Sequence, residues 1–105
     1  MATTTKALFR GAATTTTSTT LYTVPTTSTN TVVTNIVVSN TATSASTVTM
    51  AIDGVNILPT VSVAANSIAT FDVKQVIPAN ATPKVITGGA STTAVAIHIS
   101  GVEIA

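Results

Sequence analysis

Few side chains of this chain can do acid–base or metal chemistry, because it holds four Lys or Arg, three Asp or Glu and one His among 105 residues. His98 is the histidine, and an imidazole can act as a general base or as a metal ligand. Its neighbours Ile97 and Ile99 share the apolar face of an alternating run, so His98 falls on the polar face of a strand. No cysteine and no acidic cluster lies near it in the sequence. We therefore interpret His98 as an outward-facing or interface residue.

The three acidic residues, Asp53, Asp72 and Glu103, are far apart in the sequence. Glycosidases need two carboxyl groups at a set separation, and no pair here carries a local signature of such a site. Asp53 is followed by Gly54, and hairpin geometry explains an Asp-Gly pair without any ligand. The sequence therefore predicts neither a catalytic carboxylate pair nor a metal site.

Hydroxyl side chains are abundant, with 25 Thr and 9 Ser, but they become nucleophiles only beside a base and an orienting group. The sequence contains no Gly-x-Ser-x-Gly elbow, and Gly88-Gly89 lacks the lysine and helix of a phosphate-binding loop. We predict that the protein is not an enzyme, that it has no catalytic residues, and that it needs no metal or other cofactor.

The net charge of +1 is too small for the basic surface that DNA, RNA or anionic lipid requires. No apolar run reaches the roughly 20 residues of a membrane span, and the N-terminus lacks the apolar run of a secretory signal. Without cysteine, a small domain has no disulfides, and oligomerisation is a common substitute. We expect a protein that is made in a cytoplasm, forms oligomers, and binds neither nucleic acid nor membrane.

The elements that must position these side chains are strands. Thr, Val and Ile favour strands, and no 3.6-residue apolar stripe persists. Alternating runs are separated by Gly, Pro, Asn and Ser, a spacing typical of a sandwich or barrel. We predict one all-β domain, an antiparallel β-sandwich resembling a jelly roll, with about eight or nine short strands. The predicted strands cover residues 8–12, 21–24, 31–40, 47–52, 55–58, 61–63, 68–74, 84–87 and 92–104.

The run 31–40 gives the clearest strand of the chain. Its alternation places Val32, Ile36 and Val38 on one face. The opposite face is also largely apolar, which favours a strand that is central in its sheet or partly covered by a neighbour.

Glycines mark three places where the strands turn or change phase. Asp53-Gly54 predicts a tight hairpin, because both turn positions need positive φ, and Pro59 is expected to close it. Gly88-Gly89 predicts a second turn. In the last strand, simple alternation would direct Gly101 and Glu103 inward, so we predict a β-bulge near Ser100-Gly101 that restores an apolar inner face.

We expect residues 1–17 to form an N-terminal arm and a low-complexity lead-in, with an exposed connection at 14–20, and residues 18–105 to form the sandwich. Two of the chain's few cations lie on this arm, and an arginine can form a bidentate pair with a carboxylate of a neighbouring subunit. We predict partner contacts at Lys6, Leu8, Phe9 and Arg10.

A nearly neutral surface lowers self-repulsion, so many copies can pack closely. β-branched threonine stiffens strands while it stays polar. These properties suit a rigid module in a repeating shell.

The strand patterns that define the chain lie at Leu21–Pro25, Val32–Asn40, Thr47–Ala51 and Val95–Ile104. Together they resemble small β-sandwich virion proteins of tailed bacteriophages, which include capsid decoration (cement) proteins. The resemblance covers roughly residues 18–105 and brings no catalytic or ligand residues. It implies a structural protein of the virion, made in the host cytoplasm, that sits as a homotrimer on the major capsid protein or another virion protein. Its implied role is to stabilise the head shell.

Two other functions remain open. One is a tail, baseplate or fibre-attachment component, which the number of copies per particle would distinguish from a shell protein. The other is a module that binds a host-surface glycan. The predicted loops hold no Trp, Tyr or Phe, which counts against the aromatic platform that glycan sites usually need.

Overall fold

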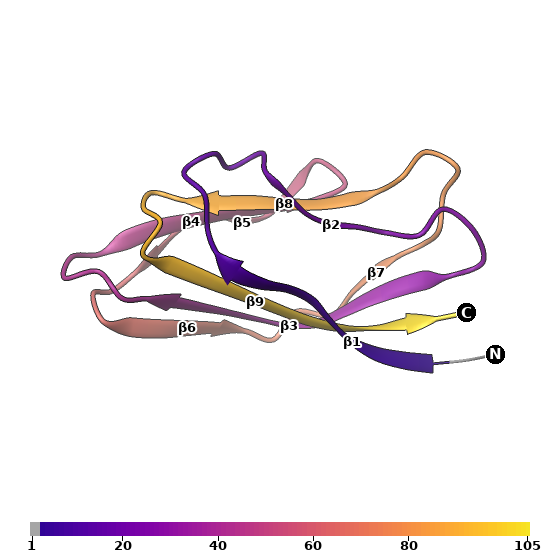
Figure 1. The fold of residues 1–105 in the computed structure, drawn as a ribbon, viewed down its shortest axis with the longest axis horizontal. Helices are drawn as coiled ribbons and strands as arrows, with labels where there is room; N and C mark the ends of the chain where they lie inside the picture. Colours follow the sequence, from indigo (N-terminus) through magenta and orange to yellow (C-terminus); the bar gives the residue numbers. More distant parts are fainter. Residues whose placement is uncertain (1–2) are drawn as a thin grey trace.

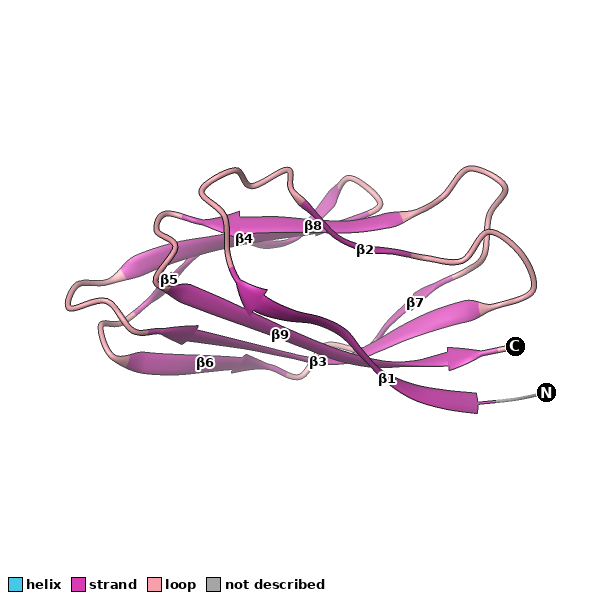
Figure 2. Ribbon diagram, viewed as in Figure 1, coloured by secondary structure: helices cyan, strands magenta, loops and turns pink. Residues whose placement is uncertain are grey.

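The computed structural model describes residues 3–105, which form nine strands and no helix. The strands make two antiparallel sheets packed face to face (Figures 1 and 2), and the molecule measures 45 × 23 × 18 Å. In this described part, no helix is long and apolar enough to cross a membrane. The strands are β1 (Thr3–Ala12), β2 (Thr20–Thr23), β3 (Asn30–Asn40), β4 (Ser46–Ile52), β5 (Val55–Val63), β6 (Ser67–Phe71), β7 (Gln75–Ile77), β8 (Val85–Ala90) and β9 (Val95–Ile104).

The strand order is that of a jelly roll. β1 pairs with β9, β2 with β8, β3 with β6 and β7, and β4 with β5, as in one long hairpin whose tip lies between β4 and β5. Rolling up this hairpin gives a first sheet of order β1-β9-β3-β6, with β7 also on β3, and a second sheet of order β2-β8-β4-β5. Because β6 and β7 share the place of one strand, nine strands make the eight positions of a jelly roll. The predicted antiparallel sandwich is confirmed.

The most regular strands carry the core as predicted. Val48 and Met50 of β4 and Ile97 and Ile99 of β9 are at most 1% exposed, and each pair is separated by one outward residue. The Asp53-Gly54 hairpin is also confirmed. The φ angles of 54° and 76° at these two residues are the left-handed pair that a type I′ turn requires.

Two β-bulges interrupt the first sheet at the same level, on either side of β9. Opposite Ser100-Gly101, β3 contains one extra residue, Thr34. On the other side of β9, β1 contains the extra residue Leu8. The irregularity lies where the sequence predicted it, but the extra residues belong to the neighbouring strands. The prediction of a bulge within β9 itself is therefore wrong.

Strand β9 instead keeps its alternation, so Gly101 and Glu103 face the space between the sheets. Gly101 is buried, and an added Cβ there would lie 2.5 Å from the carbonyl oxygen of Val32 and 2.8 Å from Cδ1 of Leu8. The glycine thus gives Leu8 the room that its bulge requires.

In β3, the bulge changes which residues face the core. Thr34 shifts the phase, so Val33 rather than Val32 shares the buried face with Ile36 and Val38. The predicted face is corrected accordingly. Val32 is left on the outer side, where it is half-buried.

Three further strand predictions are corrected. β8 runs through Gly88-Gly89, which the sequence predicted to be a turn. An added Cβ on Gly89 would lie 2.5 Å from the carbonyl oxygen of Thr16, so the glycine lets the loop before β2 cross the strand. β5 continues through Pro59 at a register shift, because edge strands tolerate proline at bulges. The end of the predicted strand 68–74 leaves the sheet, and β7 follows it.

The N-terminal segment belongs to the sandwich. The sequence predicts an arm over residues 1–17 with a short strand at 8–12, whereas β1 begins at Thr3, where it pairs with Ile104. The first two residues of the expected arm lie outside the described residues. The exposed connection expected at 14–20 corresponds to the loop between β1 and β2.

Candidate protein-binding face

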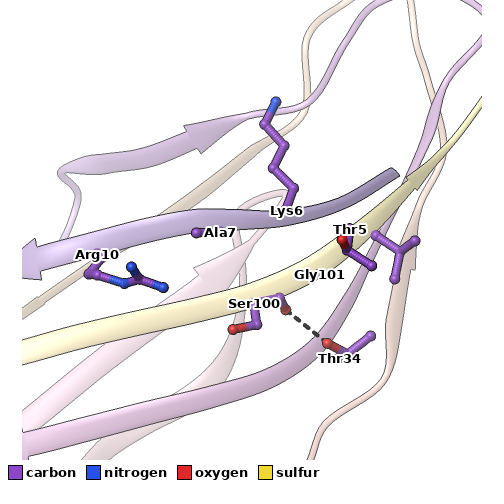
Figure 3. A pocket seen from close by; sticks show the side chains of 8 residues that line it. Thr5, Lys6, Ala7, Arg10, Thr34, Ser100 and Gly101 are labelled. Carbon is purple, nitrogen blue, oxygen red and sulfur yellow. Dashed lines mark hydrogen bonds between the residues drawn. The ribbon is translucent and has the colours of Figure 1, made fainter. Parts of the chain in front are cut away.

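The outer face of the first sheet, which points away from the core, holds a shallow depression of about 410 Å³ (Figure 3). The depression lies over the two bulges, which bend the strands locally. Its lining residues are Thr5, Lys6, Ala7 and Arg10 of β1, Thr34 of β3, and Ser100, Gly101 and Val102 of β9.

Polar side chains from three strands surround the depression. Figure 3 shows Arg10, Ser100, Thr34 and Thr5 around it, whereas the side chain of Lys6 extends away from them. Thr34 Oγ1 donates a hydrogen bond to the carbonyl oxygen of Ser100 at 3.2 Å, which joins the bulge in β3 to β9. Ser100 and Arg10 are both exposed, so their polar groups are accessible to a partner.

Arg10 differs from the three lysines because it has no ion-pair partner among the described residues. Each acidic residue of the chain forms an ion pair with a lysine, whereas Arg10 forms none with any residue between 3 and 105. Within residues 3–105, Arg10 is therefore the one Lys or Arg side chain without an ion-pair partner, and it lies on the outer face of the first sheet. The three pairs are Lys6–Glu103 at 3.3 Å, Lys74–Asp72 at 3.1 Å and Lys84–Asp53 at 3.3 Å.

His98 lies next to Arg10 in the sheet register, with Val37 on its other side. It alternates with the buried Ile97 and Ile99 and is itself half-buried. The interpretation of His98 as an outward-facing strand residue is confirmed. The imidazole therefore belongs to the same face as Arg10.

Three valines form a row across the outer face beside the depression. Val102 of β9 is directly opposite Val32 of β3, and Val32 is directly opposite Val76 of β7. Val76 is 66% exposed. A row of aliphatic side chains beside a polar rim is typical of a protein interaction surface. Ile68 of β6 is 69% exposed on the same outer face, but it lies opposite Ser39, near the other end of β3.

The outer face of the second sheet carries hydroxyl groups instead. Thr47 and Thr49 of β4 and Thr87 of β8 alternate with buried residues and therefore point outward. The hydroxyl oxygens of Thr49 and Thr60 lie 3.3 Å apart. Such a surface is well hydrated, so an apolar partner surface fits the first sheet better than the second.

Lys6 lines the depression, but its side chain extends into a polar cluster at the end of the sandwich. The hydroxyl of Tyr22, in β2, donates a hydrogen bond to Glu103 Oε2. Lys6 Nζ donates to Glu103 Oε1 and to the Tyr22 hydroxyl, each at 3.3 Å, and lies 5.3 Å from the centre of the tyrosine ring. Thr31 Oγ1 donates to Glu103 Oε2 at 3.5 Å. This cluster ties β2 of the second sheet to three strands of the first.

The contacts in the cluster fix its protonation. The hydrogen bond from Tyr22 lowers the pKa of Glu103 below its ordinary value of 4.5, and Lys6 lowers it further. Burial and the bond to Glu103 raise the pKa of Tyr22 above 10.0. The hydrogen bonds with Tyr22 and Glu103 raise the pKa of Lys6 above 10.5. All three groups thus titrate away from neutral pH, where an acid–base catalyst works best, and the arrangement acts as an ion-paired link.

The structure places the four predicted partner contacts in different surroundings. Leu8 is 6% exposed and belongs to the core. Phe9 is half-buried and packs against the core. Lys6 is bound to Glu103. Arg10 is the one whose charged group is exposed on the outer face and unpaired within the described residues, and its contact with a partner stays a prediction.

Sequence reasoning missed the row of Val32, Val76 and Val102. One signal was present, because the second apolar face of the run 31–40 favoured a strand covered by a neighbour. The row itself depends on the register between three strands that are far apart in the sequence.

Among residues 3–105, no three His, Cys, Asp or Glu side chains gather closely enough to hold a metal ion. No protein-family model matches the chain, and a search of curated proteins finds no match.

Proposed function

We propose that the protein is a non-enzymatic structural subunit of a tailed-phage virion, a capsid decoration (cement) protein that binds the head shell through the outer face of its first sheet. The observation that carries the proposal is the meeting, on that face, of an unpaired arginine and exposed aliphatic side chains. The strand patterns that resemble virion β-sandwich proteins support the same function.

The energetics of this face suit a contact that is repeated many times. Burying Val76 and Ile68 against a partner contributes on the order of 1–2 kcal/mol each. A paired Arg10 adds orientation and specificity more than affinity. In a shell, symmetry repeats the same contact at every equivalent position, so a modest gain per copy stabilises the whole particle. The proposed partners are the major capsid protein or another virion protein, and further copies of this chain in a homotrimer.

A tail, baseplate or fibre component is the alternative within the virion, and it would use the same face. The number of copies per particle separates the two, because a decoration protein follows the symmetry of the shell. A glycan-binding role is less well supported, since the ring of Tyr22 is half-buried and its hydroxyl is bound to Glu103.

The proposed function is tested by sedimenting the protein with empty head shells of the phage that encodes it. We expect the wild-type chain to sediment with the shells and to raise their melting temperature. Val76→Asp should abolish most of this binding, because it places a hydrated charge in the valine row. Ser62→Asp is the matched control, since it adds the same charge on the exposed outer side of the second sheet.

Light scattering of the free protein tests the trimer. A stable trimer that binds shells supports the proposal, whereas a monomer that ignores shells contradicts it. Equal loss of binding in both aspartate variants would move the contact away from the first sheet.

A further inference from the structure

We infer that the depression beside Arg10 binds a carboxylate from an acidic side chain of the partner protein, and that an aliphatic side chain of the same partner segment packs on the valine row. This inference rests on the proposed function and names the chemistry of its partner surface. It follows from which groups on the outer face still lack a partner.

The unpaired charge at Arg10 sets the ligand class. The guanidinium group presents several N–H donors in a planar fork that matches the two oxygens of a carboxylate. The lysines are already paired with acids, whereas Arg10 forms no ion pair with any residue from 3 to 105. The exposed hydroxyl of Ser100, which also lines the depression, can donate a further hydrogen bond to the same anion.

The row of Val32, Val76 and Val102 sets a second requirement on the partner, which is an aliphatic side chain. Val102 lies four residues along β9 from His98, the neighbour of Arg10 in the register, which corresponds to about 13 Å. An extended partner segment covers this span with an acidic residue at one position and an aliphatic residue four positions away, because both side chains then point to the same side. Packing on the valines removes apolar surface from water, which adds affinity to that of the charge pair.

Charge counting argues against other occupants of the depression. Nucleic acids and anionic membranes are bound by many cations, and the described residues of this face offer one unpaired cation, Arg10. In a second copy of the chain, each of the three acidic side chains already lies beside a lysine, so binding Arg10 would require it to exchange partners. A two-fold contact through the same face would also bring Arg10 against Arg10. These observations favour a different protein as the partner.

The first experiment measures binding to head shells for Arg10→Gln and for Lys74→Gln, a control that removes an exposed cation at another place. We expect Arg10→Gln to weaken binding about tenfold or more and Lys74→Gln to leave it unchanged. Arg10→Lys should restore only part of the affinity, because an ammonium group cannot form the bidentate pair. Unchanged melting curves of the free variants establish that each is folded.

The second experiment identifies the chemistry of the ligand. A carbodiimide joins an amine to a neighbouring carboxylate through an amide, with loss of water to the reagent. In Arg10→Lys bound to shells, we expect the introduced lysine to be joined to an Asp or Glu of a shell protein. A contact with DNA phosphate or lipid would give no such peptide, and that result would overturn the inference.

Failure of the inference can be separated from failure of the proposed function. If the wild-type chain binds shells and Arg10→Gln binds equally well, the function stands and the carboxylate site is wrong. If the wild-type chain does not bind shells, the site is tested by NMR with a capped five-residue peptide that has glutamate first and leucine last. We expect this peptide to shift the amide resonances of Ser100 and Val102 more than its glutamine counterpart does. Equal shifts with the two peptides would rule the site out.

Discussion

Strand β3 carries a buried polar residue near each end, and the two ends of the sandwich are closed by different chemistry. Asn40 is 2% exposed and Thr31 is fully buried. At the Asn40 end, the side chain binds mainly backbone groups, and one side-chain contact joins them, from Ser46 Oγ to Asn40 Oδ1 at 3.4 Å. Nδ2 lies within 3.0–3.3 Å of the carbonyl oxygens of Ser44, Val63 and Ala64, and Oδ1 accepts the backbone N–H of Ala42 at 3.0 Å.

At the other end, the contacts join side chains, and two of these side chains, Lys6 and Glu103, are charged. Glu103 accepts hydrogen bonds from Tyr22, Lys6 and Thr31. The carboxylate is 14% exposed and the lysine 44% exposed, so water and salt reach this cluster.

The two ends differ in whether their contacts depend on pH and salt. The amide of Asn40 does not titrate, and its backbone partners fix the loops that follow β3 and β5. The Glu103 cluster depends on pH and ionic strength. Lys6 and Arg10 both belong to β1, and because Lys6 pairs with Glu103, Arg10 is the unpaired Lys or Arg side chain of the described residues.

The largest effect is expected from Asn40→Ala. It removes the side chain that satisfies several buried backbone groups, so we expect a loss of about 2–4 kcal/mol in the free energy of unfolding, measured by urea denaturation. The control is Asn56→Ala, at an exposed position of β5, which should cost less than about 0.5 kcal/mol. A similar small cost for both variants would show that water replaces the Asn40 contacts.

Next in size is Tyr22→Phe, which keeps the ring and removes the hydroxyl that donates to Glu103. We expect a loss of about 1–2 kcal/mol, because the bond is made to a charged group but is partly open to water. A double-mutant cycle with Glu103→Gln measures the coupling, and additive losses would mean that the two side chains do not interact.

The sequence predicts the parts of this molecule that depend on local pattern. Val48 and Met50 alternate with threonines, and Asp53-Gly54 can form its turn with no distant partner. The bulge at Thr34 was assigned to the wrong strand because Val32 and Val33 are equally apolar. Either phase of β3 therefore buries a valine, and the choice depends on the pairing with β9.

The contacts of the Glu103 cluster and the role of Gly88-Gly89 could not be predicted from local pattern. Tyr22 and Glu103 are 81 residues apart in the sequence, and only the closure of the jelly roll brings their strands to the same end. Gly88-Gly89 resembles a turn locally, but its place in β8 is explained by the loop at Thr16, which passes over the strand. The residues near these glycines show no pattern that predicts this crossing.

The third prediction concerns pH. Since the folded-state pKa of Glu103 lies below its ordinary value of 4.5, its stabilising contribution is complete above that pH and is lost as the pH falls through the lower folded value. Glu103→Gln should cost about 1 kcal/mol near pH 7, and its stability should converge with that of the wild type in acid. A constant difference between the two proteins across an acid titration would contradict the pairing.

Lys6→Met should have the smallest effect, because the ammonium group is partly hydrated and exposed ion pairs contribute little to folding. The raised pKa of Lys6 places its contribution below about 10.5, and it is lost as the pH rises through the higher folded value. We expect a small loss of thermal stability at neutral pH that disappears in about 1 M NaCl, where charges are screened. The matched control, Lys74→Met, breaks a pair exposed on both sides and should have a still smaller effect. If Lys6→Met instead destabilises as much as Tyr22→Phe in high salt, then the lysine acts through its packing on the Tyr22 ring. The stability of this end of the sandwich would then depend less on pH and salt than its charges imply.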